Sequence, residues 1–204
     1  MNVAIMGGTF DPPHLAHVSP VEAAKNEFGL DVVWFVPALI PPHKLNRHRT
    51  DPFHRTAMLA LALNPFPFFK ISTVELLRGD ISFTVNTVRE FHTTLQSGDR
   101  LFFILGSDSF LELNTWYEPA ELLGLCELII ISRGDAAGEL LKNLEQLEKS
   151  LRLNLNNKVH FASSPHLPYS STEIRRMIEN GENVSTMLNP DVDAYIKKHS
   201  LYRR

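Results

Sequence analysis

Residues 2–17 read NVAIMGGTFDPPHLAH, and this stretch predicts a buried strand, a tight turn and the start of a helix. The apolar run at residues 2–6 is typical of a strand covered on both faces. It ends at Gly7 and Gly8, where the absence of a Cβ lets backbone amides approach a ligand closely. The stretch therefore predicts the first strand–turn–helix unit of an α/β fold.

The rest of the chain repeats this alternation of strand and helix. Val21, Ala24 and Phe28 share one face of the first helix, and Gly29 closes it. The other predicted elements, in chain order, are a strand at 31–37, helices around 58–63 and 85–95 with a strand at 68–74 between them, strands at 101–105 and 127–132, a helix at 140–151, a strand at 158–162, and helices starting at 170 or 171 and at 190. The alternation predicts a doubly wound, mostly parallel α/β sheet with right-handed crossovers. We expect one domain over residues 1–204, with 170–204 as its small C-terminal helical part.

The composition is that of an ordinary globular protein and limits the function classes. The 204 residues are 44% hydrophobic and carry a net charge of -3, without the basic stripe expected of a nucleic-acid binder. No apolar stretch approaches the roughly 20 residues that cross a bilayer, and the first residues show neither a charged n-region nor a long apolar h-region. We therefore expect a cytoplasmic protein without a membrane or nucleic-acid partner. The single cysteine, Cys126, lies in an apolar run, so we expect it to be buried and not nucleophilic.

His14 and His17 follow the glycine turn and indicate an anion site. They are three residues apart at a predicted helix start, so they share one face beside the positive end of the helix. Together with the glycine turn they suit a polyphosphate, although the stretch is neither a GxxxxGK[ST] phosphate loop nor a GxGxxG fingerprint. Two surface histidines at a structural corner are the simpler alternative. A zinc site ranks below phosphate binding, because no Cys or Glu close in sequence completes the ligand set.

A second candidate anion site lies near residue 171. Ser170 and Glu173 have capping-box spacing, and Ser171, Thr172 and Arg175 add hydroxyls and a guanidinium to the same helix start. A plain capped helix with solvated arginines accounts for Ser170 and Glu173. It does not require the other three residues.

Taken together, these two motifs resemble those of the nucleotidylyltransferase superfamily, and more narrowly those of bacterial nicotinate mononucleotide adenylyltransferases. The resemblance covers nearly the whole chain and includes the stretches at 41–44, 75–84, 106–108 and Trp116. It departs from the family pattern at Ala16, at Tyr169 and after Arg133, where Gly134 replaces a common proline. The fold implied is the Rossmann-like nucleotidylyltransferase fold.

The resemblance also implies residue roles. The catalytic residues would be His17, His14 and Arg175. The ATP site would comprise Gly7, Gly8, Thr9, Phe10, His14, His17, Gly106, Asp108, Ser171, Thr172 and Arg175. The nicotinate mononucleotide site would comprise Lys44, Thr84, Trp116, Tyr117 and Arg133, with Trp116 stacked on the pyridine ring and backbone amides near Thr84 and Tyr117 receiving the carboxylate. A core position is the alternative for Trp116, and a solvated loop position for Lys44.

The implied reaction transfers AMP from ATP to nicotinate mononucleotide, giving nicotinate adenine dinucleotide and pyrophosphate in NAD biosynthesis. It needs no protein nucleophile. Mg²⁺ would be the cofactor, held mainly by the ATP phosphates without a protein metal site. The alternatives are an adenylyltransferase with a phosphopantetheine acceptor and a nucleotide-binding regulator without catalysis. The sequence allows a homo-oligomer and does not determine the oligomeric state.

Overall fold

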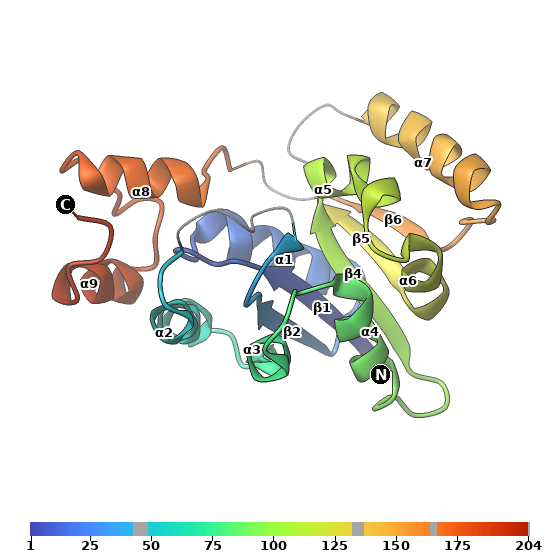
Figure 1. Cartoon of the computed structure of the whole chain (residues 1–204), viewed down its shortest axis with the longest axis horizontal. Helices are drawn as coiled ribbons and strands as arrows, with labels where there is room; N and C mark the ends of the chain where they lie inside the picture. The colour runs from blue at the N-terminus through green and yellow to red at the C-terminus, as the bar shows by residue number, and fades with distance from the viewer. Residues whose placement is uncertain (43–48, 132–136, 164–166, 204) are drawn as a thin grey trace.

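Six parallel strands form one sheet in the order β3-β2-β1-β4-β5-β6 (Figure 1). The computed structural model describes residues 1–42, 49–131, 137–163 and 167–203. The strands are β1 (Asn2–Gly8), β2 (Val32–Pro37), β3 (Phe69–Ile71), β4 (Arg100–Gly106), β5 (Glu127–Ile131) and β6 (Val159–Ala162). This is the order of a doubly wound sheet, as the sequence predicts.

Helices connect these strands and complete the C-terminal part. They are α1 (Leu15–Glu27), α2 (Pro52–Leu63), α3 (Val74–Arg78), α4 (Thr84–His92), α5 (Ser107–Leu111), the 3-10 helix η2 (Leu113–Thr115), α6 (Pro119–Leu125), α7 (Ala137–Leu151), α8 (Ser171–Glu179) and α9 (Pro190–Lys198). The N-caps of the last two helices confirm the sequence expectation. Ser170 Oγ accepts from the amide of Glu173, and the side chain of Asn189 accepts from the amide of Asp191.

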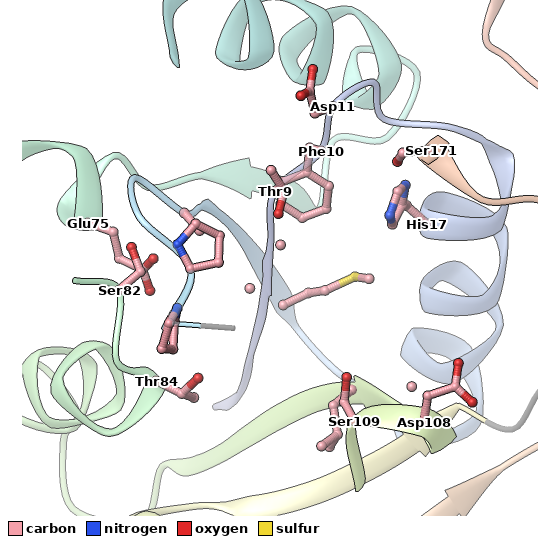
Figure 2. Close-up of a pocket in the computed structure, with 18 of the residues that line it drawn as sticks. Thr9, Phe10, Asp11, His17, Glu75, Ser82, Thr84, Asp108, Ser109 and Ser171 are labelled. Atoms are coloured by element: carbon pink, nitrogen blue, oxygen red, sulfur yellow. The ribbon is translucent and has the colours of Figure 1, made fainter. Parts of the chain in front are cut away.

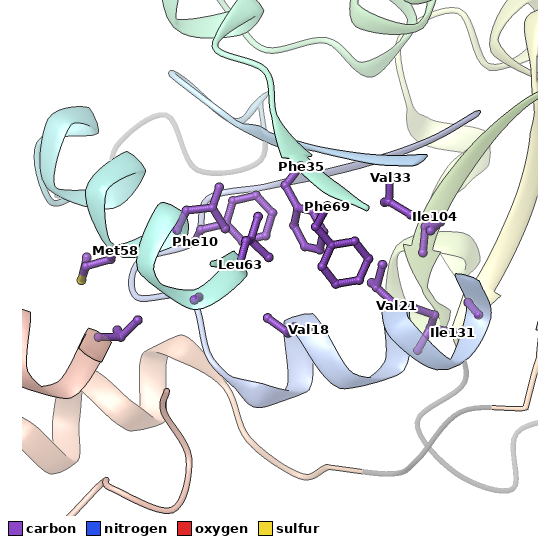
Figure 3. Close-up of a cluster of buried hydrophobic side chains, with 14 of the residues drawn as sticks. Phe10, Val18, Val21, Val33, Phe35, Met58, Leu63, Phe69, Ile104 and Ile131 are labelled. Atoms are coloured by element: carbon purple, nitrogen blue, oxygen red, sulfur yellow. The ribbon is translucent and has the colours of Figure 1, made fainter. Parts of the chain in front are cut away.

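Both faces of the sheet are buried, which explains the continuous apolar runs. In β4, Phe102 and Ile104 pack on one face with residues of α1, α2, α8 and α9. Leu101 and Phe103 pack on the other face with residues of α4, α5, α6 and α7. Figure 3 shows the first cluster, where side chains of α1 and α2 meet those of the strands. Because α8 and α9 share this cluster, we propose that residues 1–204 form one domain.

Two expectations about secondary structure were wrong in detail. The strand predicted at 68–74 is only β3, and Val74 begins the unpredicted helix α3, which ends before Gly79 in the left-handed region at φ 77°. Ser72 and Thr73 separate β3 from α3, and Thr73 is the N-cap of α3, a helix-start signal that the prediction of one long strand overlooked. The helix predicted around 85–95 ends at His92, which leaves Leu95 outside it. The short helices α5 and α6 were also missed, because five to seven residues hold too few turns to display a periodicity.

The chain reverses its winding between β1 and β4, the two central strands. β1 pairs with β2 on one side and with β4 on the other, so the connections leave these strands in opposite directions. Open α/β sheets bind ligands at such a point, beyond the carboxyl ends of the strands. Gly7 and Gly8 end β1 and Gly106 ends β4, so the predicted ligand-binding turns lie at this point.

Candidate active site

A cavity of about 900 Å³ opens at this point of the sheet. Its lining includes every described residue predicted from the sequence for either substrate: Gly7, Gly8, Thr9, Phe10, His14, His17, Thr84, Gly106, Asp108, Trp116, Tyr117, Ser171, Thr172 and Arg175. Figure 2 shows His17 and Ser171 on one side of the cavity and Thr84, Ser82 and Glu75 on the other. The cavity therefore has two ends, which we call the phosphate end and the acceptor end.

The two histidines of the phosphate end lie against each other. His14 caps the N-terminus of α1 and is buried, while His17 sits in the first turn. Their ring centroids are 3.7 Å apart, and the backbone amide of His14 donates to Nδ1 of His17 at 3.3 Å. Because Nδ1 of His17 acts as acceptor, the neutral ring carries its proton on Nε2. His17 can therefore offer an N–H to a phosphate oxygen.

The loop between β1 and α1 changes direction at Phe10. Its backbone is in the left-handed region at φ 50°, which a non-glycine residue adopts rarely. Its side chain is 1% exposed and points into the cluster of α1, α2 and the strands (Figure 3). Any contact of Phe10 with phosphate must therefore come from its backbone, which refines the predicted role.

Helix α8 is attached directly to this loop. Ser171 Oγ donates to the carbonyl of Pro12 at 3.0 Å, and Arg175 Nη1 donates to the carbonyl of Asp11 at 2.6 Å. Arg175 Nη2 also reaches Thr172 Oγ1 at 3.3 Å. A guanidinium has five N–H donors, so donors remain for a ligand. The two motifs that the sequence separates by more than 150 positions thus meet at the phosphate end.

The acceptor end combines an aromatic wall with a helix N-terminus. Trp116 is partly buried and meets the ring of Phe103 edge-on at 6.2 Å. Tyr117 is half exposed, and its ring lies 4.6 Å from that of Phe83. Thr84 is the first residue of α4, so its amide has no acceptor within its own helix. The ring contact brings the loop of Tyr117 beside this free helix end.

Arg89 joins the same two segments at the surface. It lies on α4 and pairs with Glu118 and Glu121, which begin α6 directly after Tyr117. Arg89 Nη1 also donates to Asn86 Oδ1 at 2.6 Å within α4. The last turn of α4 is therefore held by charge to the start of α6, while the ring contact of Phe83 and Tyr117 joins the start of α4 to the same region.

Two of the predicted site residues cannot be placed, and the cavity has further polar residues in its lining. Lys44 and Arg133 lie outside the described residues. The cavity is also lined by polar residues to which the sequence assigned no substrate role: Asp11, Arg49, Glu75, Ser82, Ser109, Glu112, Thr115, Glu118 and Ser170. Glu75 is 5% exposed and accepts from Thr87 Oγ1 at 2.6 Å, which links α3 to α4. Glu75 begins the stretch 75–84 that carries part of the family resemblance, but the sequence assigned it no role of its own.

No cluster of three His, Cys, Asp or Glu that could hold a metal ion occurs in residues 1–42, 49–131, 137–163 and 167–203. His14 and His17 are therefore not part of such a three-residue group in the described ranges. Cys126 is 2% exposed, and burial raises the pKa of its thiol to about 12, so it is not a nucleophile at neutral pH.

Within the described part of the chain, no helix is both long and apolar enough to cross a membrane.

Solved structures with this fold include two of Plasmodium falciparum nicotinic acid mononucleotide adenylyltransferase. The one complexed with NaAD has a TM-score of 0.77 at 21% identity, covering 98% of this chain and 97% of that one. The one complexed with APC has a TM-score of 0.71 at 22% identity, covering 98% and 96%. At these identities the likeness establishes the fold.

Sequence comparison establishes the family. The cytidylyltransferase-like family matches residues 5–177. A protein of Thermoanaerobacter sp. (strain X514), named "probable nicotinate-nucleotide adenylyltransferase", is 39% identical over 204 residues, covering 100% of this chain and 95% of that protein. One of Moorella thermoacetica with the same name is 39% identical and covers 98% and 91%. With its doubly wound sheet and its two-ended cavity at the reversal of winding, the chain belongs to the cytidylyltransferase-like family, among the nicotinate-nucleotide adenylyltransferases.

Proposed function

We propose that this protein transfers the adenylyl group of ATP to nicotinate mononucleotide, forming nicotinate adenine dinucleotide and pyrophosphate. The observation that carries the proposal is the two-ended cavity. Groups of α1 and α8 that suit phosphate occupy one end, and the start of α4 with Trp116 and Tyr117 occupies the other. The names of the relatives support the same reaction. We include in the proposal that the enzyme is cytoplasmic and uses no nucleic acid as partner.

The reaction is an in-line displacement at the α-phosphorus of ATP. A phosphate oxygen of the mononucleotide forms the new P–O bond, and the bond to the bridging oxygen breaks as pyrophosphate leaves with its electron pair. A phosphate monoester is largely ionised at neutral pH, so no residue has to remove a proton from it. The chain contributes positioning and charge stabilisation. His17 Nε2–H and His14 would meet oxygens of the reacting phosphate, and Arg175 those of the departing pyrophosphate.

Magnesium fits this site as an ion held mainly by the substrate. The described residues contain no cluster that would form a protein cage for it, whereas Mg²⁺ keeps several waters and binds through substrate phosphates. Asp108 and Glu112 lie one helical turn apart at α5, and both line the cavity. These two carboxylates would contact the ion or its waters there. When bound, the ion would offset the negative charge of the triphosphate.

The acceptor end favours a carboxylate over a carboxamide. The amides of Thr84 and of Tyr117 belong to segments that the Phe83–Tyr117 ring contact holds together. A nicotinate carboxylate accepts from two N–H groups, with charge-assisted bonds. A carboxamide has one oxygen, so its NH₂ would face the second donor and leave it unsatisfied, at a cost of about 1–3 kcal/mol. That cost corresponds to a preference of roughly tenfold to a hundredfold.

Pyrophosphate release tests the proposal directly. Each of three mixtures contains the protein, ATP, Mg²⁺ and one acceptor. The acceptors are nicotinate mononucleotide, nicotinamide mononucleotide and phosphopantetheine. We expect release with the first acceptor at a specificity constant at least about tenfold above that of the second. A preference for phosphopantetheine would identify a different adenylyltransferase. ATP binding without release of pyrophosphate in the presence of any of the three acceptors would identify a regulator without catalysis.

A further inference from the structure

The carboxylate of Asp11 connects the loop between β1 and α1 (residues 9–14), which we call the phosphate loop, to a residue beyond the end of α9. Asp11 is 3% exposed, and its Oδ1 accepts from the hydroxyl of Tyr202 at 2.7 Å. Its Oδ2 accepts from the amide of Thr50 at 3.1 Å. Burial and the adjacent Asp11 carboxylate raise the pKa of Tyr202, so its hydroxyl keeps the proton that it donates. Both carboxylate oxygens are therefore used to hold the loop to other parts of the chain.

Arg55 holds the same loop from the interior. This arginine of α2 is 1% exposed, and its Nη1 donates to the carbonyl of Thr9 at 2.7 Å while its Nε donates to the carbonyl of Thr50 at 3.0 Å. Burial lowers the pKa of its guanidinium, and the Asp11 carboxylate opposes that shift. A buried arginine without such partners would be costly. Its placement indicates that the backbone of residues 9–11 is held in one conformation.

The direction of these bonds bears on phosphate binding. The carbonyl of Thr9 points to Arg55, and in a trans peptide the following N–H, that of Phe10, points the opposite way. Arg55 does not line the cavity, whereas Phe10 does. The left-handed backbone of Phe10 persists only when its surroundings fix it. The contacts of Asp11 and Arg55 supply that fixation on either side of Phe10.

We propose that Tyr202 is a positioning residue for ATP: its hydrogen bond to Asp11 holds the backbone of residues 9–11 in the conformation that receives the triphosphate. The inference rests on the proposed function in that ATP is the nucleotide bound. Tyr202 is not among the residues that line the cavity, whereas Asp11 is, so Tyr202 acts through Asp11. It should therefore influence ATP binding without influencing the acceptor end.

The chain provides a matched control in Tyr195. This tyrosine of α9 also bonds through its hydroxyl to α2, at 2.9 Å from Nδ1 of His54, so its hydroxyl is directed to a residue outside the phosphate loop. Tyr202→Phe and Tyr195→Phe each remove one hydroxyl from the C-terminal part. The affinity for Mg-ATP is measured by titration calorimetry, and the Michaelis constants of both substrates by pyrophosphate release.

We expect Tyr202→Phe to weaken ATP binding on the order of tenfold, with the Michaelis constant of the acceptor within twofold of the wild-type value. Tyr195→Phe should leave both quantities within twofold. A Tyr202→Phe protein with unchanged ATP affinity, with both constants raised equally, or with an effect that Tyr195→Phe reproduces would overturn the inference and leave the proposed function standing. A wild-type protein that binds no ATP would overturn both.

Hydrogen exchange gives a second measurement that needs no ligand. The amides of the segment 9–11 should exchange faster in Tyr202→Phe than in the wild type, and at the wild-type rate in Tyr195→Phe. Equal exchange in all three proteins would contradict a positioning role, even where ATP affinity changes.

Discussion

The imidazole rings of His14 and His17 lie 3.7 Å apart, and the backbone amide of the first fixes the ring of the second. Both side chains line the phosphate end of the cavity. Because the fold supplies this arrangement without a ligand, the donor of His17 needs no reorganisation when the reaction charge develops.

Replacement of His17 by alanine should therefore lower turnover by about a hundredfold to a thousandfold, since loss of one preorganised donor typically costs about 2.7–4 kcal/mol. The rate is measured by pyrophosphate release at saturating substrates, with circular dichroism as the check of folding. His92→Ala is the matched control, because His92 is an exposed histidine at the end of α4. Turnover within a fewfold of wild type in folded His17→Ala would contradict the catalytic role.

The ring of Phe10 leaves no room for a side chain at position 8. A Cβ at Gly8 would lie 2.8 Å from Cζ of Phe10, whose ring is buried and cannot move aside, whereas a Cβ at Gly7 would meet only ordinary contacts at 3.7 Å. Gly8→Ala should therefore reduce the free energy of unfolding by about 1–3 kcal/mol, as overpacked positions do. Urea denaturation of Gly8→Ala and Gly7→Ala measures the difference. Equal stability of the two variants would show that the loop relaxes around the methyl group.

Trp116 should affect the acceptor more than ATP. Its ring lines the acceptor end, and a ring stack is typically worth about 0.5–1.5 kcal/mol beyond the buried area. Trp116→Ala should raise the Michaelis constant of nicotinate mononucleotide by at least roughly twofold to tenfold and leave that of ATP nearly unchanged. Trp34→Ala is the control, because Trp34 is a partly buried tryptophan that packs on Phe91. Lost stability with unchanged constants in Trp116→Ala would make Trp116 a core residue only.

The fold was largely predictable because its signals are local. Continuous apolar runs marked the buried strands, and the glycines at 7, 8 and 106 marked the ligand-binding edge. Arg55 and Tyr202 could not be recognised in the same way. On the sequence, Arg55 is a single charge in a helix and Tyr202 an aromatic beside arginines. Their roles depend on contacts with residues 46 and 191 positions away, for which the sequence contains no local pattern.

Arg89 should influence the choice of acceptor although it is not in the cavity lining. Its pairs with Glu118 and Glu121 hold the last turn of α4 to the start of α6, directly after Tyr117. Arg89→Ala should lower the preference for nicotinate over nicotinamide mononucleotide severalfold, and Arg89→Lys should restore part of it by keeping the charge. Ratios of specificity constants at saturating ATP provide the measurement. Arg100→Ala, which breaks an exposed pair with Glu127 at the start of β4 and β5, should leave the ratio unchanged.

A change in acceptor preference in Arg100→Ala equal to that in Arg89→Ala would indicate a general loss of stability. An unchanged preference in Arg89→Ala would show that the aromatic contact of Phe83 and Tyr117 is enough to align the two amides.

The bond between Tyr202 and Asp11 also sets an order of events in the biosynthesis of the protein. It joins residues 191 positions apart, and contacts of such long range form late, after the intervening chain has become compact. A growing chain can pair β1 with β2 and later with β4, but its phosphate loop lacks this support until Tyr202 can reach Asp11. Nascent chains in which Tyr202 cannot yet reach Asp11 would therefore bind ATP weakly, even when their sheet is complete.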